Sequence, residues 1–292
     1  MQSGEPSRTA WGAAVHRAAH QVLEQGRIFS DALALRILGG DADSILREAE
    51  RRTSKRTMRI FVAARARFAE DALAAAVEEG VTQLVVLGAG LDTFAYRSPF
   101  GDRLRVFEVD HPATQAWKRE QLQHADIPAP RWLTFAPIDF ERQSLAEGLA
   151  LAGFDRGQQT FFTWLGVVPY LAEEAVWATL AYIGAMPGGA HVVFDYSDPP
   201  ETLPEEARAR HNQLATRVEA AGEAFRSYFE ADGLHAKMRA LGFCGIEDLG
   251  PPEIDARWFP ERTGLAREKG GHILRASTRV VSPDRRTDPP AG

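Results

Sequence analysis

The chain has 292 residues, 45% of them hydrophobic and 25% charged, with a formal net charge of −6. This is the composition of a globular protein, and the acidic balance, with basic and acidic residues interleaved, excludes the footprint of a nucleic-acid-binding protein. The single cysteine, Cys244, excludes an intramolecular disulfide and a cysteine-based metal site, and no apolar run approaches the ~18 residues of a membrane span, so we expect a cytoplasmic protein.

The N-terminal part is predicted to be helical. The pattern indicates one helix over residues 10–38 and a long helix or helix pair over residues 44–79. His16 and His20 are four residues apart, a spacing that can bind a metal, but no third ligand accompanies them and no metal is expected. Because this part directly precedes a glycine-rich turn, we expect it to close over that turn as a cap.

The glycine-rich turn organises the rest of the chain. An apolar run over residues 84–87 predicts a buried strand, and Gly88, Ala89 and Gly90 predict a sharp turn after it. Glycines there allow positive φ and let a nucleotide approach the backbone, whose N–H groups can hold polar ligand atoms. Thr93 occupies the position of the third glycine of a dinucleotide motif, which disfavours a pyrophosphate.

A second strand, residues 104–109, leads to the acidic pair Glu108 and Asp110. Asp110 follows Gly90 by about 20 residues, the spacing expected of an acid that accepts hydrogen bonds from ribose hydroxyls. A nucleoside held by a glycine turn and a ribose acid, without a pyrophosphate, indicates S-adenosylmethionine as the cofactor.

The remaining elements continue the alternation of strands and helices. Glu173 begins a helix, and a polar, mostly helical insertion precedes the last strands at the edge of the sheet where ligands bind. The pattern predicts helices over residues 113–124 and 173–186, an insertion over 199–240, and strands over 131–135, 159–164, 190–196, 245–249 and 271–278.

Three segments carry a family resemblance. They are residues 83–93 with Tyr96 and Arg97, residues 107–112 (FEVDHP) with Lys118, and residues 164–171 (WLGVVPYL). In order and spacing they resemble the class I S-adenosylmethionine-dependent methyltransferases of the leucine carboxyl methyltransferase type, in the bacterial O-methyltransferase branch. The resemblance implies an α/β, Rossmann-like fold: a seven-stranded, mostly parallel sheet with helices on both faces, an antiparallel final strand and a helical lid.

The resemblance also implies a set of cofactor contacts. An arginine before the glycine-rich strand would pair with the methionine carboxylate, and Arg65 fits this position, with Arg67 as the alternative. Asp92 and Asp139 equally suit a turn or helix cap, His111 suits the start of a helix, and Trp164 suits packing in the core. The implied contacts beyond Arg65 are Gly88, Ala89, Gly90, Asp92, Thr93, Asp110, His111, Asp139, Phe140 and Trp164.

The acceptor side is less defined. Tyr170, Tyr196 and Arg226 are the candidate substrate contacts. Leu165 stands where many members of the family carry a glutamate, so the acceptor of the carboxyl methyltransferases does not carry over directly.

The implied reaction is SN2 transfer of a methyl group to an oxygen of a small-molecule carboxylate or hydroxyl, with the protein providing alignment. A carboxylate needs no base, whereas a phenol or alcohol benefits from one, and no base stands out. Two alternatives are an S-adenosylmethionine-binding protein that transfers no methyl group, and a NAD(P)-dependent oxidoreductase.

We expect one methyltransferase domain over residues 1–292. It would comprise a helical cap (8–80), a cofactor-binding core (81–196), a lid insertion (197–242), C-terminal strands (243–280) and a loose tail (281–292).

Overall fold

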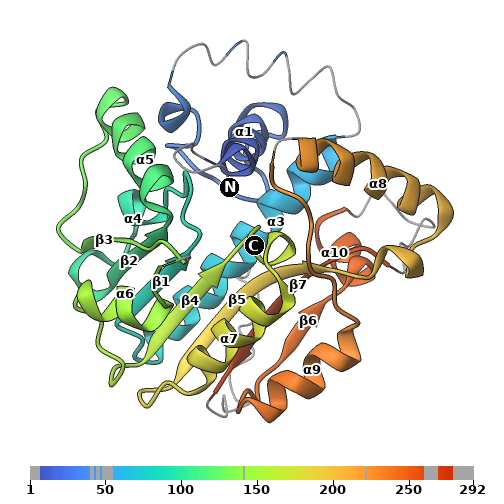
Figure 1. The fold of residues 1–292 in the computed structure, drawn as a ribbon. Helices are drawn as coiled ribbons and strands as arrows, with labels where there is room; N and C mark the ends of the chain where they lie inside the picture. The colour runs from blue at the N-terminus through green and yellow to red at the C-terminus, as the bar shows by residue number, and fades with distance from the viewer. Residues whose placement is uncertain are drawn as a thin grey trace, which may run out of the picture.

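The structure is a computed structural model that describes residues 7–39, 43, 47, 55–140, 142–220, 222–259 and 269–278. Its centre is a seven-stranded sheet with the order β3-β2-β1-β4-β5-β7-β6 (Figure 1). Neighbouring strands among β1 to β5 are parallel, and β7 is antiparallel to both β5 and β6. The predicted seven-stranded, mostly parallel sheet with an antiparallel last strand is therefore confirmed. The strands are β1 (Gln83–Leu87), β2 (Arg105–Asp110), β3 (Leu133–Pro137), β4 (Thr160–Trp164), β5 (Ala190–Ser197), β6 (Glu247–Leu249) and β7 (Gly271–Ser277).

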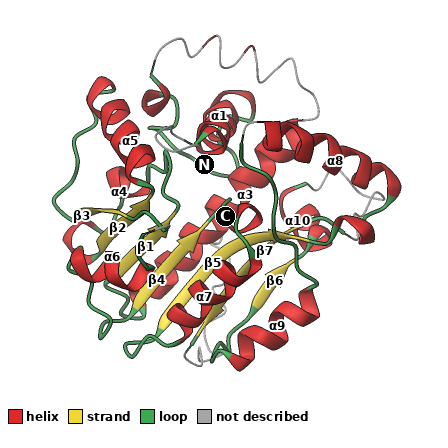
Figure 2. Cartoon of the chain, viewed as in Figure 1, coloured by secondary structure: helices red, strands yellow, loops and turns green. Residues whose placement is uncertain are grey.

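Helices cover both faces of the sheet (Figure 2). On one face, α3 (Lys55–Glu78), α4 (Phe94–Arg97) and α10 (Pro251–Trp258) contribute to a common core, and on the other face α6 (Leu145–Leu151), α7 (Glu173–Gly184) and α9 (Ala231–Ala240) do so. All five residues of β1 are buried, because a central strand between two helical layers needs apolar side chains on both sides. This explains why residues 84–87 of β1 form a continuous apolar run in the sequence.

The elements outside these layers lie mainly at the carboxyl edge of the parallel strands. They are α1 (Arg8–Leu23) and α8 (Glu205–Ala220), together with α5 (Pro112–His124) beside β3. The short 3-10 helices are η1 (Arg36–Leu38), η2 (Gly101–Arg103), η3 (Val168–Tyr170) and η4 (Pro200–Thr202). Figure 1 shows α1 above the edge toward which the parallel strands point, the location expected of a cap.

One of the two N-terminal expectations needs correction. The helix predicted over residues 10–38 ends at Leu23, because Gln25 and Gly26 adopt positive φ values of 55° and 63° and turn the chain back. The predicted helix over 44–79 is present as α3 from Lys55, and residues 44–54, apart from Arg47, lie outside the described part of the chain.

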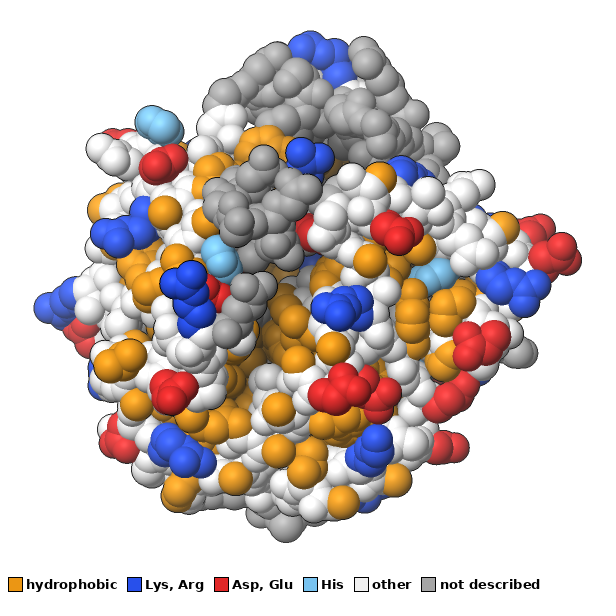
Figure 3. All heavy atoms as spheres, in the orientation of Figure 1, with side chains coloured by type: hydrophobic (Ala, Val, Ile, Leu, Met, Phe, Trp, Pro, Cys, Tyr) orange, Lys and Arg blue, Asp and Glu red, His pale blue; other side chains and the backbone are white. Residues whose placement is uncertain are grey.

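The surface agrees with the charge pattern of the sequence. Figure 3 shows Lys and Arg side chains interspersed with Asp and Glu across the visible face. Within the described residues, no helix combines the length and apolar character needed to cross a bilayer.

Candidate cofactor site

The glycine turn follows β1 directly. Gly88 and Gly90 have positive φ values of 66° and 43°, so both favour glycine for conformational reasons. A Cβ at position 88 would lie 2.4 Å from Val167 Cγ2, and one at position 90 would lie 2.9 Å from the Cβ of Ala10. The expectation that glycine keeps space for a ligand is thus incomplete, because both glycines also admit other segments of the chain. Gly88 remains exposed, whereas α1 covers Gly90, and Ala89 is buried.

Asp110, at the end of β2, lies against this turn. Its Oδ2 accepts a hydrogen bond from the Gly90 N–H at 2.6 Å, and its Oδ1 accepts one from the His111 N–H at 2.7 Å. Burial raises the pKa of this carboxyl group, while the two N–H donors act in the opposite direction. Since a carboxylate oxygen can accept two hydrogen bonds, each oxygen retains capacity for a ligand hydroxyl. The backbone bonds fix the orientation of the carboxylate beside the turn.

His111 and Asp92 both stabilise the start of a helix. The His111 ring Nδ1 accepts a hydrogen bond from the Ala113 N–H at 3.2 Å and so caps α5. Asp92 Oδ1 accepts one from the Phe94 N–H at 2.8 Å at the start of α4. The sequence allowed these two side chains either a capping role or a ligand contact, and the structure shows the capping role.

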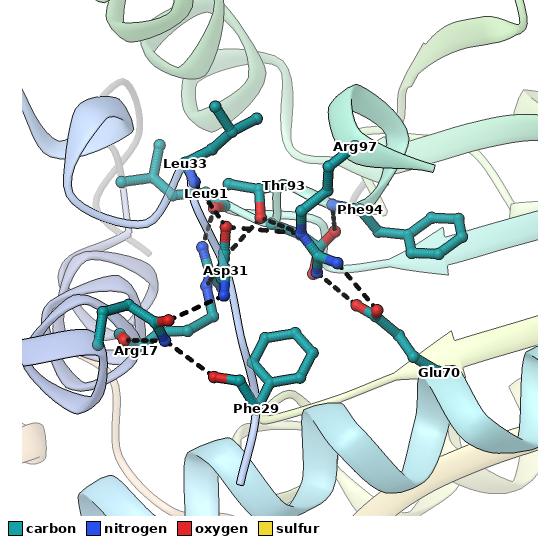
Figure 4. Close-up of polar contacts among 11 residues, drawn as sticks. Arg17, Phe29, Asp31, Leu33, Glu70, Leu91, Thr93, Phe94 and Arg97 are labelled. Carbon is teal, nitrogen blue, oxygen red and sulfur yellow. Dashed lines mark hydrogen bonds and ion pairs between the residues drawn. The ribbon is translucent and has the colours of Figure 1, made fainter. Parts of the chain in front are cut away.

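Thr93 faces away from the exposed side of the turn. Its side chain is fully buried and donates a hydrogen bond to Asp31 Oδ2 at 2.7 Å, while it accepts one from Arg97 Nε at 3.1 Å (Figure 4). The hydroxyl is therefore engaged within the protein, and a cofactor contact at Thr93 stays a prediction.

Asp31 joins the cap to the turn through two arginines. It accepts a hydrogen bond from Arg17 Nε at 2.8 Å, and Arg17 Nη2 donates to the Leu91 carbonyl at 2.5 Å (Figure 4). Arg97 lies 3.5 Å from Asp31 and forms a two-pronged pair with Glu70 of α3. Burial alone would raise the pKa of Asp31, but Arg17 and Arg97 lower it.

Sequence reasoning missed this network. Its members Arg17, Asp31, Glu70 and Arg97 are far apart in the chain and share no periodic pattern. The Tyr96-Arg97 pair inside the family segment was the only available signal, and it assigned no role to Arg97.

Arg65 points to the carboxyl ends of β4 and β5. Its side chain is buried, and Nη1 donates to Asp195 Oδ2 at 2.9 Å, while Asp195 Oδ1 accepts from the Gly166 N–H at 2.6 Å. Arg67, the alternative, is exposed and pairs with Asp71 along α3. Of the two arginines, only Arg65 therefore presents a guanidinium group at the edge that holds the glycine turn.

The two aromatic residues among the cofactor candidates differ sharply in exposure. Phe140, beyond β3, has 60% of its surface exposed, and its neighbour Asp139 lies 3.4 Å from Arg142. Trp164 is only 2% exposed and packs in the core near Phe194, and a cofactor contact at this residue stays a prediction. Phe140 offers an open face for a planar ring, whereas Trp164 supports the sheet.

The candidate substrate residues lie in two different places. Tyr170 lies in η3, its ring centroid 5.2 Å from that of Phe225, and burial raises its pKa to about 12. The Arg226 N–H donates to the Pro169 carbonyl at 2.7 Å, and its side chain is exposed. These contacts dock the segment after α8 onto η3, beside the carboxyl edge.

Tyr196 does not join them. It is 2% exposed, and its hydroxyl hydrogen-bonds with Asp248 at 2.5 Å and with His272 at 3.1 Å. The hydroxyl is thus engaged by residues of β6 and β7, and a substrate contact at Tyr196 stays a prediction.

The cap and the lid meet at the N-terminus of α1. The Thr9 N–H donates to Glu223 Oε2 at 2.8 Å, and Glu223 lies in the segment after α8. This hydrogen bond places the start of α1 beside the segment that follows α8.

A buried ion pair supports β2 behind the site. Glu108 Oε2 lies 2.7 Å from Lys118 Nζ, and neither side chain is more than 1% exposed. Burial raises the pKa of Glu108 to about 7, although the lysine opposes the shift. Lys118 of the family segment therefore neutralises a buried acid on the strand that ends in Asp110.

Comparisons relate the chain to known proteins. The family described as leucine carboxyl methyltransferase matches residues 10–184. A Bacillus subtilis (strain 168) protein, provisionally named S-adenosyl-L-methionine-dependent methyltransferase YktD, is 34% identical over 68% of this chain and 66% of its own. A Mycobacterium marinum protein with the same provisional activity in its name is 28% identical over 92% of this chain and 83% of its own.

Among solved structures, a DUF574 family protein from Streptomyces avermitilis has a TM-score of 0.56 and 14% identity over 90% of this chain and 97% of that chain, a likeness of fold alone. The chain spans between 49% and 66% of the length of the first three curated relatives it matches.

Proposed function

The chain belongs to the leucine carboxyl methyltransferase family, a family of S-adenosylmethionine-dependent methyltransferases, and we propose that it methylates an oxygen of a small molecule. The observation that carries this proposal is the pairing of Asp110 with the glycine turn, in which the Gly90 N–H lies 2.6 Å from the carboxylate. Family membership also argues against the nicotinamide-dependent alternative, as does Thr93 in place of a third glycine.

The residues at the carboxyl edge fit the three parts of the cofactor. Asp110 has free acceptor capacity for the ribose hydroxyls, and the exposed ring of Phe140 suits the adenine. Arg65 uses Nη1 for Asp195 and has further N–H groups for the methionine carboxylate.

In the proposed mechanism, the protein contributes orientation and water exclusion. When bound, S-adenosylmethionine supplies a methyl group on a positively charged sulfur, which is already a good leaving group. Arg65 and Asp110 would fix the two ends of the cofactor, and the contact between Thr9 and Glu223 would hold the cap and lid closed over the acceptor. A carboxylate acceptor would then need no proton transfer.

Tyr170 and the exposed Arg226 remain our candidate acceptor contacts. Both belong to the junction between η3 and the segment after α8, where the ring of Phe225 lies against Tyr170. A guanidinium and aromatic rings in one junction suit a small acid or phenol. Leu165, which packs partly buried against the core, offers no carboxylate to such an acceptor.

The test begins with calorimetric titration of the protein with S-adenosylmethionine, S-adenosylhomocysteine and NADH. We expect binding of the first two and none of NADH. Asp110→Ala should weaken S-adenosylhomocysteine binding by about 2–4 kcal/mol, because two charge-assisted hydrogen bonds are lost. Asp232→Ala on the exposed surface of α9 is the matched control and should leave the affinity unchanged.

A second assay addresses transfer. Methyl-labelled S-adenosylmethionine is incubated with panels of aromatic and aliphatic carboxylates, phenols and alcohols, and labelled ester or ether products are sought. Cofactor binding with no labelled product in any panel would favour the alternative of a binding protein. Failure of the folded protein to bind either sulfur nucleoside would remove the basis of the proposal.

A further inference from the structure

A cavity lies on the outer side of α3, apart from the carboxyl edge. It has a volume of about 430 Å³ and is formed by the turn after α1, the exposed side of α3 and the end of α10. This volume lies within the range of small-molecule sites. None of the proposed cofactor contacts lines it.

The cavity has an excess of positive charge in a chain whose net charge is negative. Four arginines (Arg27, Arg56, Arg67 and Arg257) and two acids (Glu24 and Asp71) line it. Both acids already have partners. Glu24 accepts hydrogen bonds from Arg59 at 2.7 and 2.5 Å, and Asp71 accepts them from Arg67 at 2.8 Å.

The state of Glu24 supports this charge balance. Burial alone would raise its pKa, but hydrogen bonds from Arg59 and His20 lower it to about 2, so Glu24 is an ion-paired carboxylate near neutral pH. Glu24 pairs mainly with Arg59, and Arg59 does not line the cavity. By contrast, Arg27 and Arg257 form no ion pair with any residue in the described part of the chain.

Arg257 is oriented by aromatic rings. Its guanidinium carbon lies 4.8 Å from the centroid of the Trp258 ring and 5.9 Å from that of Phe68. Cation–π contacts of this kind hold a guanidinium in place without using its N–H groups, which remain available to an anion. The Trp258 ring, with Ile28 and Ile60, also supplies an apolar wall to the cavity.

We propose that this cavity binds a small anion that carries an aromatic or apolar group. The carboxylate or phosphate head is held by Arg27 and Arg257, and the apolar part lies on Trp258 and the two isoleucines. A guanidinium group binds a carboxylate or a phosphate through two parallel hydrogen bonds. The ligand class is therefore an oxyanion attached to an apolar group.

The site is distinct from the proposed cofactor site. Arg65 and Arg67 are two residues apart on α3, a spacing that places side chains on different sides of a helix. Accordingly, Arg65 reaches Asp195 at the sheet edge, whereas Arg67 lines the cavity. An anion held by Arg27 and Arg257 joins the turn after α1 to α10, and therefore stabilises the cap from outside.

The experiment titrates the full chain with phenyl phosphate, benzoate and inorganic phosphate, each with and without saturating S-adenosylhomocysteine. We expect one-to-one binding of phenyl phosphate or benzoate, tighter than that of inorganic phosphate, and a rise in the melting temperature with ligand concentration. The comparison of phenyl phosphate with benzoate identifies the preferred head group. Arg27→Gln and Arg257→Gln should each weaken binding by about tenfold or more, as expected for loss of a charge-assisted hydrogen bond.

Arg239→Gln, an exposed arginine of α9, is the matched control and should bind as the wild type does. Trp258→Leu should reduce the preference for phenyl phosphate over inorganic phosphate. No saturable binding, binding that survives Arg27→Gln and Arg257→Gln combined, or loss of binding in the presence of S-adenosylhomocysteine would each overturn the proposal. Because the titrations also run without the cofactor product, failure of the methyltransferase proposal would leave this test intact.

Discussion

Asp31 provides the most demanding test of how the cap is held on the glycine turn. Its side chain is completely buried and accepts hydrogen bonds from Arg17 Nε, Thr93 Oγ1 and the Leu33 N–H at 2.8, 2.7 and 3.0 Å. Asp31→Asn preserves the volume but removes the negative charge. If the amide oxygen keeps the Leu33 bond, its NH₂ group faces the two donors on Arg17 and Thr93.

The expected cost follows from this arrangement. Arg17 would lose its carboxylate partner while remaining buried, and breaking a buried pair in this way costs about 3–5 kcal/mol. Arg97 would lose a more distant contact but keep Glu70. We therefore expect urea unfolding at neutral pH to show a loss of about 3–5 kcal/mol in the free energy of unfolding.

Glu206→Gln is the control, because Glu206 forms an exposed pair with Arg210 at 3.5 Å, the two side chains being 90% and 64% exposed. It should change the free energy of unfolding by less than about 0.5 kcal/mol. The pKa of Asp31 is lowered in the folded state, so its contribution is present above its ordinary value of 3.8 and is lost as the pH falls further. The difference between the wild type and Asp31→Asn should narrow accordingly in acid.

Two results would refute the reasoning. A loss of less than about 1 kcal/mol in Asp31→Asn would mean that the network does not hold the cap. Unchanged hydrogen exchange of the α1 amides in a destabilised variant would mean that the loss arises elsewhere.

Three further predictions concern single positions. Gly88→Ala should destabilise the protein by about 1–3 kcal/mol in urea unfolding, because position 88 has a positive φ and the new Cβ would lie 2.4 Å from Val167. Adding Val167→Ala should recover part of this loss, and no recovery would contradict the contact. Arg65→Lys keeps the charge but not the fork, and calorimetry should show S-adenosylhomocysteine binding weakened by about tenfold; equal affinity would remove Arg65 from the site. Burial would raise the pKa of Glu24, but Arg59 and His20 lower it to about 2, so the stability that Glu24 contributes is present above its ordinary pKa of 4.5 and is lost toward pH 2. Glu24→Gln should therefore reduce the change of the free energy of unfolding with pH in this window. An unchanged pH dependence would contradict the pairing.

Much of the fold is determined locally by the sequence. The strands are recognisable because a parallel sheet covered on both faces needs continuous apolar runs, and β1 is such a run ended by glycines. The position of Asp110 follows from its spacing after Gly90, because parallel neighbouring strands bring their carboxyl ends to one edge of the sheet. Arg65 was identified by its family position, and burial and the bond to Asp195 separate it from Arg67.

Only the tertiary structure decided which side chains face one another. Thr93 turned out to bind Asp31 rather than face the open side of the turn, and Trp164 and Tyr196 proved to be core residues although they end strands at the ligand-binding edge. Single charged residues such as Asp31 have no periodic signature, so their partners depend on how distant helices pack. The cavity beside Arg257 has the same origin, because three separate segments create it and no one of them predicts it. Periodicity reports which face of an element is buried, whereas the pairing of charges and the shape of cavities arise from contacts between elements.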